Sequence, residues 1–483
     1  MAVDETAETR TPDAGAPPPS SSFTAIPTLA LRDARSPATK PRFLAALRAA
    51  LLDVGFLYLD VTGEAALPAR LLADAVAEGV GFFAADRLPD AEKRRIEMKN
   101  EKSFLGWSRL DNETTAMHAD HREQLDLSTT HDLPGPDAPL YYNMRAPNQW
   151  PSSQYLPRFR PVFEEYMHAM SGISTFFTSL IAEAIGLPPD AFDRFFDADQ
   201  QHKLKVIKYP EVSPDVDDDD EIARQGVGPH KDSMLTSYLL QASPHRGLQA
   251  LNAAGEWIDC PPKPNTLVVA IGQGLEAITQ GVCASTTHRV LSPRCGEGPR
   301  YSIPFFQGVS YDARFEEMDV PEAVRALKRE RRDDKVDFAF VKGRWGHLGE
   351  ATLVNRVRSH PDVGEKWVSD LPLSPYSRPH RRVSLPFLSL SRPPAGCRTH
   401  IRPVLVSRRQ ISRSWRTWCT GGERASIERS AISTLHLVDV PSHLTKESDW
   451  LIRLRPRQYP GILAKIREQQ AENDVARDVH KSS

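Results

Sequence analysis

The chain has 483 residues, with 61 Lys and Arg against 63 Asp and Glu, so its formal net charge at pH 7 is −2. This balance gives no reason to expect a nucleic-acid or anionic-membrane partner, because phosphate binding needs an excess of positive charge. No segment reaches the roughly 20 apolar residues of a membrane-spanning helix, residues 1–22 lack the apolar core of a secretory signal, and the 5 scattered cysteines do not suggest a disulfide framework. We therefore expect a cytoplasmic, monomeric globular protein.

The N-terminal part of the chain is predicted to be helical after a short disordered segment. Residues 1–23 are acidic and rich in Pro and Ser, which predicts disorder. In the following region, 24–200, apolar residues recur at helical spacing over 43–52, 71–80 and 156–185. Gly186 and the Pro188-Pro189 pair end the third of these patterns. We expect these helices to pack on a core formed by the next region.

Short β-like runs dominate the next region, 201–310. Gly, Pro and Asn turns separate six such runs, at 204–209, 235–240, 248–251, 266–271, 289–291 and 301–306. Helical patterns at 320–331 and 349–358 then form a C-terminal flank, 311–367. This order predicts an α+β fold with a mainly β core, a barrel or jelly roll with flanking helices.

The C-terminal part has an unusual composition. Residues 371–420 include 10 Arg, 8 Ser and 7 Pro but no Asp, Glu or Lys. Such a segment cannot easily bury a core, so 368–441 is predicted to be a disordered tail. Three interpretations stay open: a basic tail that binds nucleic acid, a solvated tail without a partner, or translated sequence foreign to the natural protein. A short helix is expected within 442–483.

One motif and a distant histidine suggest a metal site. His230 and Asp232 lie just before a predicted strand, where residues i and i+2 point to the same side. A single His-x-Asp triplet is a weak signal, and the chain contains two others. However, His288 lies 56 residues further on, beside another predicted strand. Two histidines and one aspartate form the facial triad that suits non-haem Fe(II) and leaves three coordination positions open.

A second pair of polar residues suggests a carboxylate-binding site. Arg300 and Ser302 open the last β-like run and share one face of the predicted strand. An arginine fork and a serine hydroxyl together can hold a carboxylate group.

Together these motifs resemble a known family. They are similar to the isopenicillin N synthase-like Fe(II)/2-oxoglutarate-dependent dioxygenases, in their fungal form, over about residues 24–367. The matching segments are 26–27, 55–58, 106–107, 112–115, 122–124, 226–232, 287–290 and 300–306. The resemblance implies a double-stranded β-helix (jelly-roll) core with flanking helices.

The resemblance also implies the ligand sites. It assigns Fe(II) to His230, Asp232 and His288. It assigns the C5 carboxylate of 2-oxoglutarate to Arg300 and Ser302, with Tyr209 helping to hold this cosubstrate.

The implied reaction is oxidation of a C–H bond in a small organic substrate by O2, with release of succinate and CO2. Hydroxylation, desaturation and cyclisation all remain open. A 2-oxoglutarate-independent iron oxidase of the same fold, and a non-catalytic binding protein that retains the fold, are the alternatives. The substrate, a secondary metabolite, an amino acid derivative or a nucleobase, is expected to meet five candidate residues: Asn112, Thr115, Arg122, Phe305 and Phe306.

Overall fold

The computed structural model describes residues 22–115, 118–198, 200–217, 220–314, 320–329 and 347–369. The predicted tail segments, 368–441 and 442–483, lie outside the described residues except for positions 368 and 369. The same holds for the predicted disordered segment 1–23, except for residues 22 and 23.

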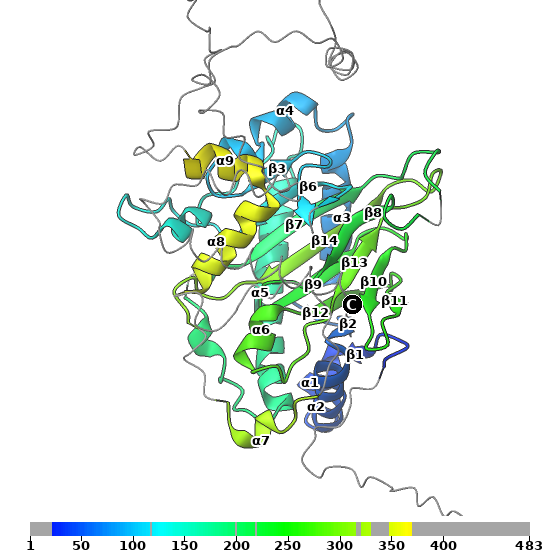
Figure 1. Ribbon diagram of the computed structural model, residues 1–483, viewed down its shortest axis with the longest axis vertical. Coiled ribbons are helices and arrows are strands. Elements are labelled where there is room, and N and C mark those ends of the chain that lie inside the picture. The colour runs from blue at the N-terminus through cyan, green and yellow to red at the C-terminus, as the bar shows by residue number, and fades with distance from the viewer. Residues whose placement is uncertain are drawn as a thin grey trace, which may run out of the picture. The chain divides into compact units, whose positions relative to one another are not determined.

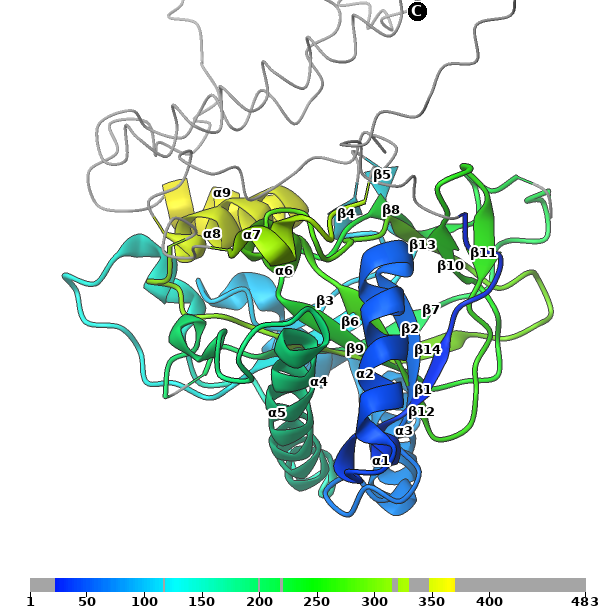
Figure 2. The ribbon, with the colours of Figure 1, turned by 90° about the horizontal axis from the view of Figure 1, so that it is seen from below.

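The β structure of the described residues consists of two β-sheets (Figure 1) and a short hairpin, which is labelled in Figure 2. The larger sheet has eight strands, in the order β1 (Thr28–Ala30), β2 (Phe56–Asp60), β12 (Thr266–Ile271), β9 (Thr236–Gln241), β14 (Arg300–Gln307), β7 (Lys203–Tyr209), β6 (Glu123–Ser128) and β3 (Gly106–Ser108). The smaller sheet has the order β11 (Trp257–Asp259), β10 (Leu248–Leu251), β13 (His288–Leu291) and β8 (Gln225–His230). The hairpin pairs β4 (Thr114–Thr115) with β5 (His118–Ala119).

All six predicted β-like runs are strands, namely β7, β9, β10, β12, β13 and β14. Among the described strands of the two sheets, only β1 and β2 run parallel to each other. The sequence analysis did not predict the other strands of the two sheets, namely β1, β2, β3, β6, β8 and β11. The first four of these lie in the region predicted to be helical, and all four join the large sheet.

An apolar core joins the two sheets. We call the face of the large sheet that carries this core its inner face. Side chains from both sheets form one buried cluster. The large sheet contributes Phe56, Tyr58, Ile207, Tyr209, Val268 and Ala270, and the small sheet contributes Val227, Leu248, Ala250 and Val290. Successive residues of a strand point to opposite faces, so the residues between them in each strand point outward. This alternation decides which side chains can reach the space between the sheets.

Helices cover the outer face of the large sheet (Figure 2). They are α1 (Leu31–Arg35), α2 (Lys40–Ala49), extended by a π-helical turn at Ala50–Val54, α3 (Ala69–Phe83) and α5 (Phe159–Ala184). The last three correspond to the three predicted helices. At Gly79 of α3 an added Cβ would lie 3.0 Å from Cγ1 of Val206 in β7, so the lack of a side chain lets this helix approach the sheet closely.

The remaining helices are short or C-terminal. They are α4 (Asp90–Arg95), α6 (Gln273–Ile278), α7 (Glu322–Arg325), α8 (Leu348–Ser359) and α9 (Pro361–Ser369). Three short 3₁₀ helices span Met98–Asn100, Leu140–Met144 and Asp193–Phe195. The helix predicted over 320–331 is much shorter than expected within the described residues, whereas the helix predicted over 349–358 is confirmed as α8.

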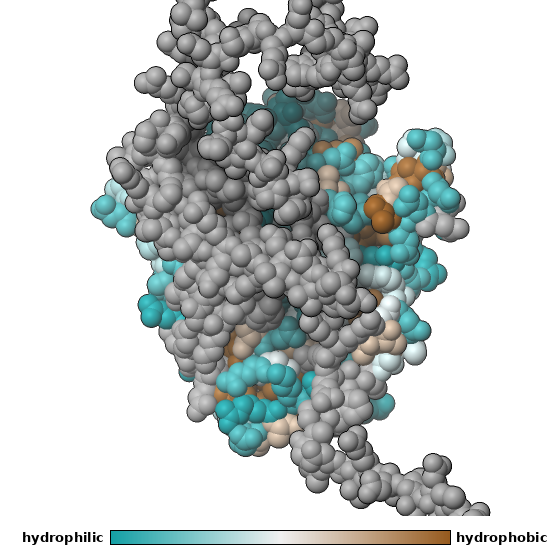
Figure 3. All heavy atoms as spheres, in the orientation of Figure 1, coloured by the Kyte–Doolittle hydropathy of each residue, from teal (hydrophilic) through white to brown (hydrophobic). Residues whose placement is uncertain are grey.

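The surface of the described residues is mostly polar in the view of Figure 3, where teal side chains prevail among small brown areas. Four large apolar side chains are exposed among the described residues: Leu110, Leu133, Tyr155 and Ile222. Scattered apolar side chains of this kind are ordinary on a protein surface. No described helix is both long enough and apolar enough to cross a membrane. The three cysteines in the described part of the chain are free thiols.

Candidate metal centre and cosubstrate site

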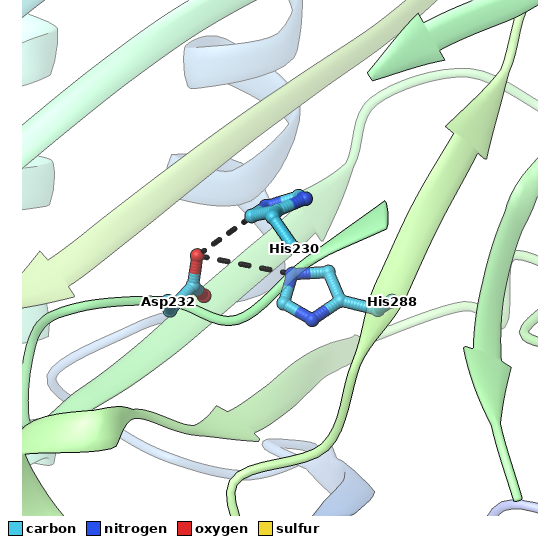
Figure 4. Close-up of side chains that lie close together, drawn as sticks. All are labelled: His230, Asp232 and His288. Atoms are coloured by element: carbon cyan, nitrogen blue, oxygen red, sulfur yellow. Dashed lines mark ion pairs between the residues drawn. The ribbon is translucent and has the colours of Figure 1, made fainter. Parts of the chain in front are cut away.

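The three predicted metal ligands come together between the two sheets. One ligand atom from each of His230, Asp232 and His288 lies within 4.8 Å of the other two (Figure 4). Oδ1 of Asp232 is 3.7 Å from Nε2 of His230 and 3.8 Å from Nε2 of His288. The two histidines face each other in the ladder between β13 and β8.

The aspartate reaches this cluster in a different way from the one expected. His230 is the last residue of β8, and Asp232 lies in the loop that leads to β9, so the pair does not share one strand face. The backbone carbonyl of Asp232 accepts a hydrogen bond from the N–H of Gln273 at 2.7 Å. An added Cβ at Gly272 would lie only 1.9 Å from the carbonyl oxygen of Met234, so a glycine is needed where α6 approaches this loop.

Hydrogen bonds orient both imidazole rings for metal binding. Nδ1 of His230 is 2.8 Å from the carbonyl oxygen of Gly228, and Nδ1 of His288 is 3.0 Å from that of Thr286. Because a carbonyl can only accept, each Nδ1 must carry the proton and donate it. Each Nε2 then presents its lone pair towards Asp232, which is the arrangement that metal-binding histidines normally have.

Charge at the cluster also suits a cation. Burial alone would raise the pKa of the Asp232 carboxyl, but His288 and His230 together lower it below its usual range. Burial lowers the pKa of His288 to about 4, and His230 adds to the effect. An ionised carboxylate beside two neutral imidazoles is the donor set that fits Fe(II).

The predicted cosubstrate residues lie on the inner face of β14 and its neighbour β7. Arg300 faces Tyr209 across the ladder, and its guanidinium carbon is 5.0 Å from the centre of that ring. Arg300 is 1% exposed, and Nη2 donates to Oε1 of Gln241 at 3.3 Å. Among the described residues, neither Nε nor Nη1 of Arg300 nor Oγ of Ser302 has a hydrogen-bond partner.

These orphaned groups are a test of the predicted cosubstrate site. Burial lowers the pKa of Arg300, because the charged form loses its hydration. A buried cation with unused donors costs free energy unless an anion approaches it. A carboxylate placed beside Arg300 and Ser302 can accept hydrogen bonds from an unused guanidinium N–H and from the serine hydroxyl, so these residues fit 2-oxoglutarate.

Three of the five substrate candidates belong to a buried polar network. Nη2 of Arg122 lies 2.8 Å from Asp120 and 3.0 Å from Glu113, and both carboxylates are buried. The hydroxyl of Thr115 also donates to Asp120, at 2.7 Å. Asn112 donates to Oδ2 of Asp362, in α9, at 3.0 Å. Thr115 and Asn112 therefore already hold other parts of the chain, whereas Arg122 keeps an unpartnered Nε.

The two phenylalanine candidates lie on opposite faces of the sheet. Phe305 faces Leu204 and Tyr238 on the outer face, and Tyr238 packs edge-on against Phe177 of α5. Its side chain is thus among the helices and does not lie with the predicted metal ligands, because strand residues alternate. Phe306 is half-buried on the inner face, opposite Ser237, whose hydroxyl helps to lower the pKa of Asp232.

The structure adds a polar stretch to the inner face that the sequence analysis missed. Gln124 and Asp126 of β6 and Lys203 and Lys205 of β7 are all buried there. Lys205 binds both oxygens of Glu113 at 3.0 Å. In the sequence, such alternating polar residues look like the solvent face of a strand, so a hidden network gives no distinct signal.

Comparisons with known proteins agree with this geometry. The family model of the 2OG-Fe(II) oxygenase superfamily matches residues 201–309. A second family model, described as the N-terminal region of non-haem dioxygenases in morphine synthesis, matches residues 26–153. A 2-oxoglutarate-dependent dioxygenase of Dothideomycetidae sp. (strain 11243), frbJ, is 63% identical over 352 residues, 72% of this chain and 92% of that protein. A 2-oxoglutarate-dependent dioxygenase of Gibberella zeae is 37% identical and covers 73% of this chain and 93% of its own length.

A solved structure supports the fold. A full-length Neurospora crassa protein, crystallised in complex with alpha-KG, superimposes with a TM-score of 0.54, covering 69% of this chain and 95% of that one at 20% identity. The predicted double-stranded β-helix with flanking helices is confirmed. The chain therefore belongs to the 2OG-Fe(II) oxygenase superfamily, and it is an enzyme that uses Fe(II), 2-oxoglutarate and O2 to oxidise a small organic substrate.

Proposed function

We propose that His230, Asp232 and His288 hold the catalytic Fe(II). The observation that carries this assignment is the convergence of the three ligand atoms within 4.8 Å of one another, with both Nδ1–H groups engaged by carbonyls. The hydroxyl of Ser237 favours the ionised form of the aspartate, and the ring of Phe56 packs on His288 with a centroid distance of 5.3 Å. A facial triad of this kind would leave three coordination positions open for other ligands of the metal.

The 2-oxoglutarate site is assigned to the adjacent part of β14. Arg300 binds the C5 carboxylate through its unused guanidinium nitrogens, and Ser302 donates its hydroxyl to the same group. Tyr209 lies over the guanidinium and excludes water from this ion pair. Low polarity around a charged hydrogen bond strengthens it, so a buried arginine holds the cosubstrate more firmly than an exposed one would.

When bound, the iron and 2-oxoglutarate supply the oxidising chemistry, in which O2 converts the cosubstrate to succinate and CO2 and a C–H bond of the substrate is oxidised. The protein's own part is to hold the reacting groups in register. Phe306 contributes an apolar wall beside Asp232, and Arg122 contributes a polar group on the side of the buried network. The reaction with the substrate is hydroxylation, desaturation or cyclisation. We also propose that the protein is a monomer and is located in the cytoplasm.

The test uses the full-length protein under anaerobic conditions. Adding Fe(II) and then 2-oxoglutarate should produce the weak visible charge-transfer band of a keto acid chelated to iron. The band should disappear or need far more cosubstrate in Arg300→Ala, because the C5 carboxylate loses its partner. Arg246, which is exposed and paired with Asp259, provides a control: Arg246→Ala should leave the band unchanged. A protein that binds Fe(II) but gives no band with 2-oxoglutarate would contradict the assigned cosubstrate site.

A further inference from the structure

Lys203 is a buried lysine that has no counter-ion among the described residues. Its side chain lies on the inner face of β7 and is 6% exposed. The ammonium donates a hydrogen bond to the carbonyl oxygen of Met144 at 3.0 Å. Among the described residues, no carboxylate lies within ion-pair distance of it. A desolvated ammonium without an anion costs several kcal/mol, so such a residue calls for a functional explanation.

The carboxylates that act on this lysine or on Arg145, which itself acts on the lysine, are already engaged. Asp126 binds Arg356 of α8 at 2.9 Å, and Asp197 binds Arg145 at 2.9 Å. Asp312 is exposed and accepts hydrogen bonds from two tyrosine hydroxyls. Burial lowers the pKa of Lys203 to about 7, and repulsion from Arg356 and Arg145 adds to this effect, which the attraction of Asp126 only partly opposes.

Two further donors lie around Arg145, which acts on this lysine, and have no partner among the described residues. The hydroxyl of Tyr311 and Nε2 of Gln201 are buried and unpartnered among the described residues. Arg145 connects them, because its Nε donates to Oε1 of Gln201 at 3.2 Å and its guanidinium carbon lies 5.7 Å from the ring of Tyr311. Burial raises the pKa of Tyr311 to about 12, so its hydroxyl keeps its proton. The unused capacity here consists of donors, which is the chemistry that receives an anion.

This donor cluster, made of Arg145, Gln201, Lys203 and Tyr311, lies within a substrate's length of the predicted iron. Lys203 of β7 lies opposite Phe306 of the neighbouring strand β14, and Phe306 lies opposite Ser237 of the next strand, β9. Two strand spacings correspond to about 10 Å, and the hydroxyl of Ser237 acts on Asp232. Arg300 lies six residues from Phe306 along β14, which is about 20 Å in an extended strand. An anion at Lys203 is therefore distinct from the carboxylate assigned to Arg300.

We propose that the donor cluster binds an anionic group of the substrate, most simply a carboxylate, and is the specificity determinant that places the substrate beside the iron. The inference rests on the proposed function, since it takes the iron to be at His230, Asp232 and His288. Phe306, between the cluster and the metal, would contact the apolar part of the same molecule. The substrate class is thus a small organic acid whose oxidised carbon lies several bonds from its carboxylate.

Propionate, with propionamide as its uncharged analogue, tests the site without knowledge of the substrate. The full-length protein is first saturated anaerobically with Fe(II) and 2-oxoglutarate, and the visible chelate band is recorded. Thermal unfolding is then followed with increasing propionate, propionamide or sodium chloride, up to about 0.1 M, where screening already weakens interactions of exposed charges. We expect a saturable stabilisation by propionate alone, since the anion binds only the folded state.

Matched variants locate the effect. Lys203→Met should weaken propionate binding roughly 30-fold or more, as expected for loss of one partner of a buried charged pair. Tyr311→Phe should weaken it less. Lys93→Met, at a buried lysine that has Glu123 as its partner, and Tyr166→Phe, at a buried tyrosine of α5 whose hydroxyl is also unpartnered, should leave it unchanged.

The outcomes separate this inference from the proposed function. Absence of the chelate band in the wild type would contradict the proposed function itself. A normal band with equal effects of propionate and propionamide would overturn the anion site alone. So would a propionate response that survives in Lys203→Met, because binding would then occur elsewhere on the protein.

Discussion

The two ends of the inner sheet face each bury a cation, and they differ in what surrounds it. At one end Arg300 lies among apolar groups, with the Tyr209 ring beside it and Gln241 as its hydrogen-bond acceptor. At the other end Lys203 lies next to a network of buried ion pairs. Both cations lack a carboxylate partner within the described residues. We propose different ligands for the two ends: the cosubstrate at Arg300 and an anionic group of the substrate at Lys203.

The largest expected effect concerns the metal beside which the Arg300 and Lys203 sites are proposed to place cosubstrate and substrate. His288→Ala should reduce Fe(II) affinity by more than the roughly 10–100-fold that loss of an outer hydrogen-bond partner costs. Anaerobic equilibrium dialysis measures this affinity. His202→Ala is the control, because His202 is as buried as His288 and burial also lowers its pKa to about 4, yet its ring lies 3.3 Å from Oγ of Ser171, away from the cluster. Equal iron affinity in His288→Ala and the wild type would contradict the assignment.

Removal of the arginine should separate stability from cosubstrate binding. Arg300→Met takes away a buried cation that has no counter-ion, so the variant should be at least as stable as the wild type without 2-oxoglutarate. At a concentration 100 times Kd, the cosubstrate should stabilise the wild type by about 2.7 kcal/mol and the variant much less. Thermal unfolding of both proteins, loaded with Fe(II) under anaerobic conditions, measures the two effects. A variant that 2-oxoglutarate stabilises as much as it does the wild type would show that Arg300 does not hold it.

The lysine end should respond to pH. The pKa of Lys203 is about 7 in the folded protein, against an ordinary value of 10.5, so between these values the unfolded chain binds more protons and stability rises with pH. Lys203→Met should therefore be most stabilising below pH 7, by at most about 5 kcal/mol, and the gain should vanish near pH 10.5. The groups that face the ammonium are Asp126, Arg145 and Arg356.

Denaturant unfolding of wild type and variant across this pH range measures the effect. Lys93→Met serves as the control, since it breaks an ion pair with Glu123 and should destabilise the protein. A Lys203→Met curve parallel to that of the wild type would mean that the lysine keeps its proton with the help of another group. Adding propionate should shrink the difference between the two curves, because a bound anion favours the charged lysine.

The smallest expected effect comes from removing a single hydroxyl group, that of Ser302, beside Arg300. Ser302→Ala removes one hydrogen bond to the cosubstrate, which is worth about 0.5–1.5 kcal/mol, so the affinity for 2-oxoglutarate should fall roughly 2–12-fold. Titration of the chelate band measures it. Ser108→Ala is a close match, because the Ser108 hydroxyl is also buried and unpartnered but lies on edge strand β3. The serine assignment fails if the two variants bind the cosubstrate equally well.

The sequence by itself determined the parts of the enzyme that depend on local order. The six β-like runs and the three long apolar helical patterns were predictable, because strand and helix periodicities are written in neighbouring residues. The sequence also predicted that His230, Asp232 and His288 form one set and that Arg300 and Ser302 form another, since each short motif accompanies a predicted strand. The structure brings the members of each set together, and their roles stay proposals. Strands β1, β2, β3, β6, β8 and β11 were missed; polar or glycine-containing segments such as 123–128 and 225–230 do not show the apolar alternation of a half-buried strand.

Only the tertiary structure decided which side chains share the inner face and what they meet there. Phe305 and Phe306 are neighbours in sequence, yet ladder register sends the first to the helices and the second towards Asp232. Lys203 is buried and comes under the influence of charged groups that lie far from it along the chain, Asp126, Arg145 and Arg356. The burial of a side chain and the presence of a counter-ion both depend on how distant segments pack, so no local pattern could reveal that this lysine has no carboxylate partner among the described residues.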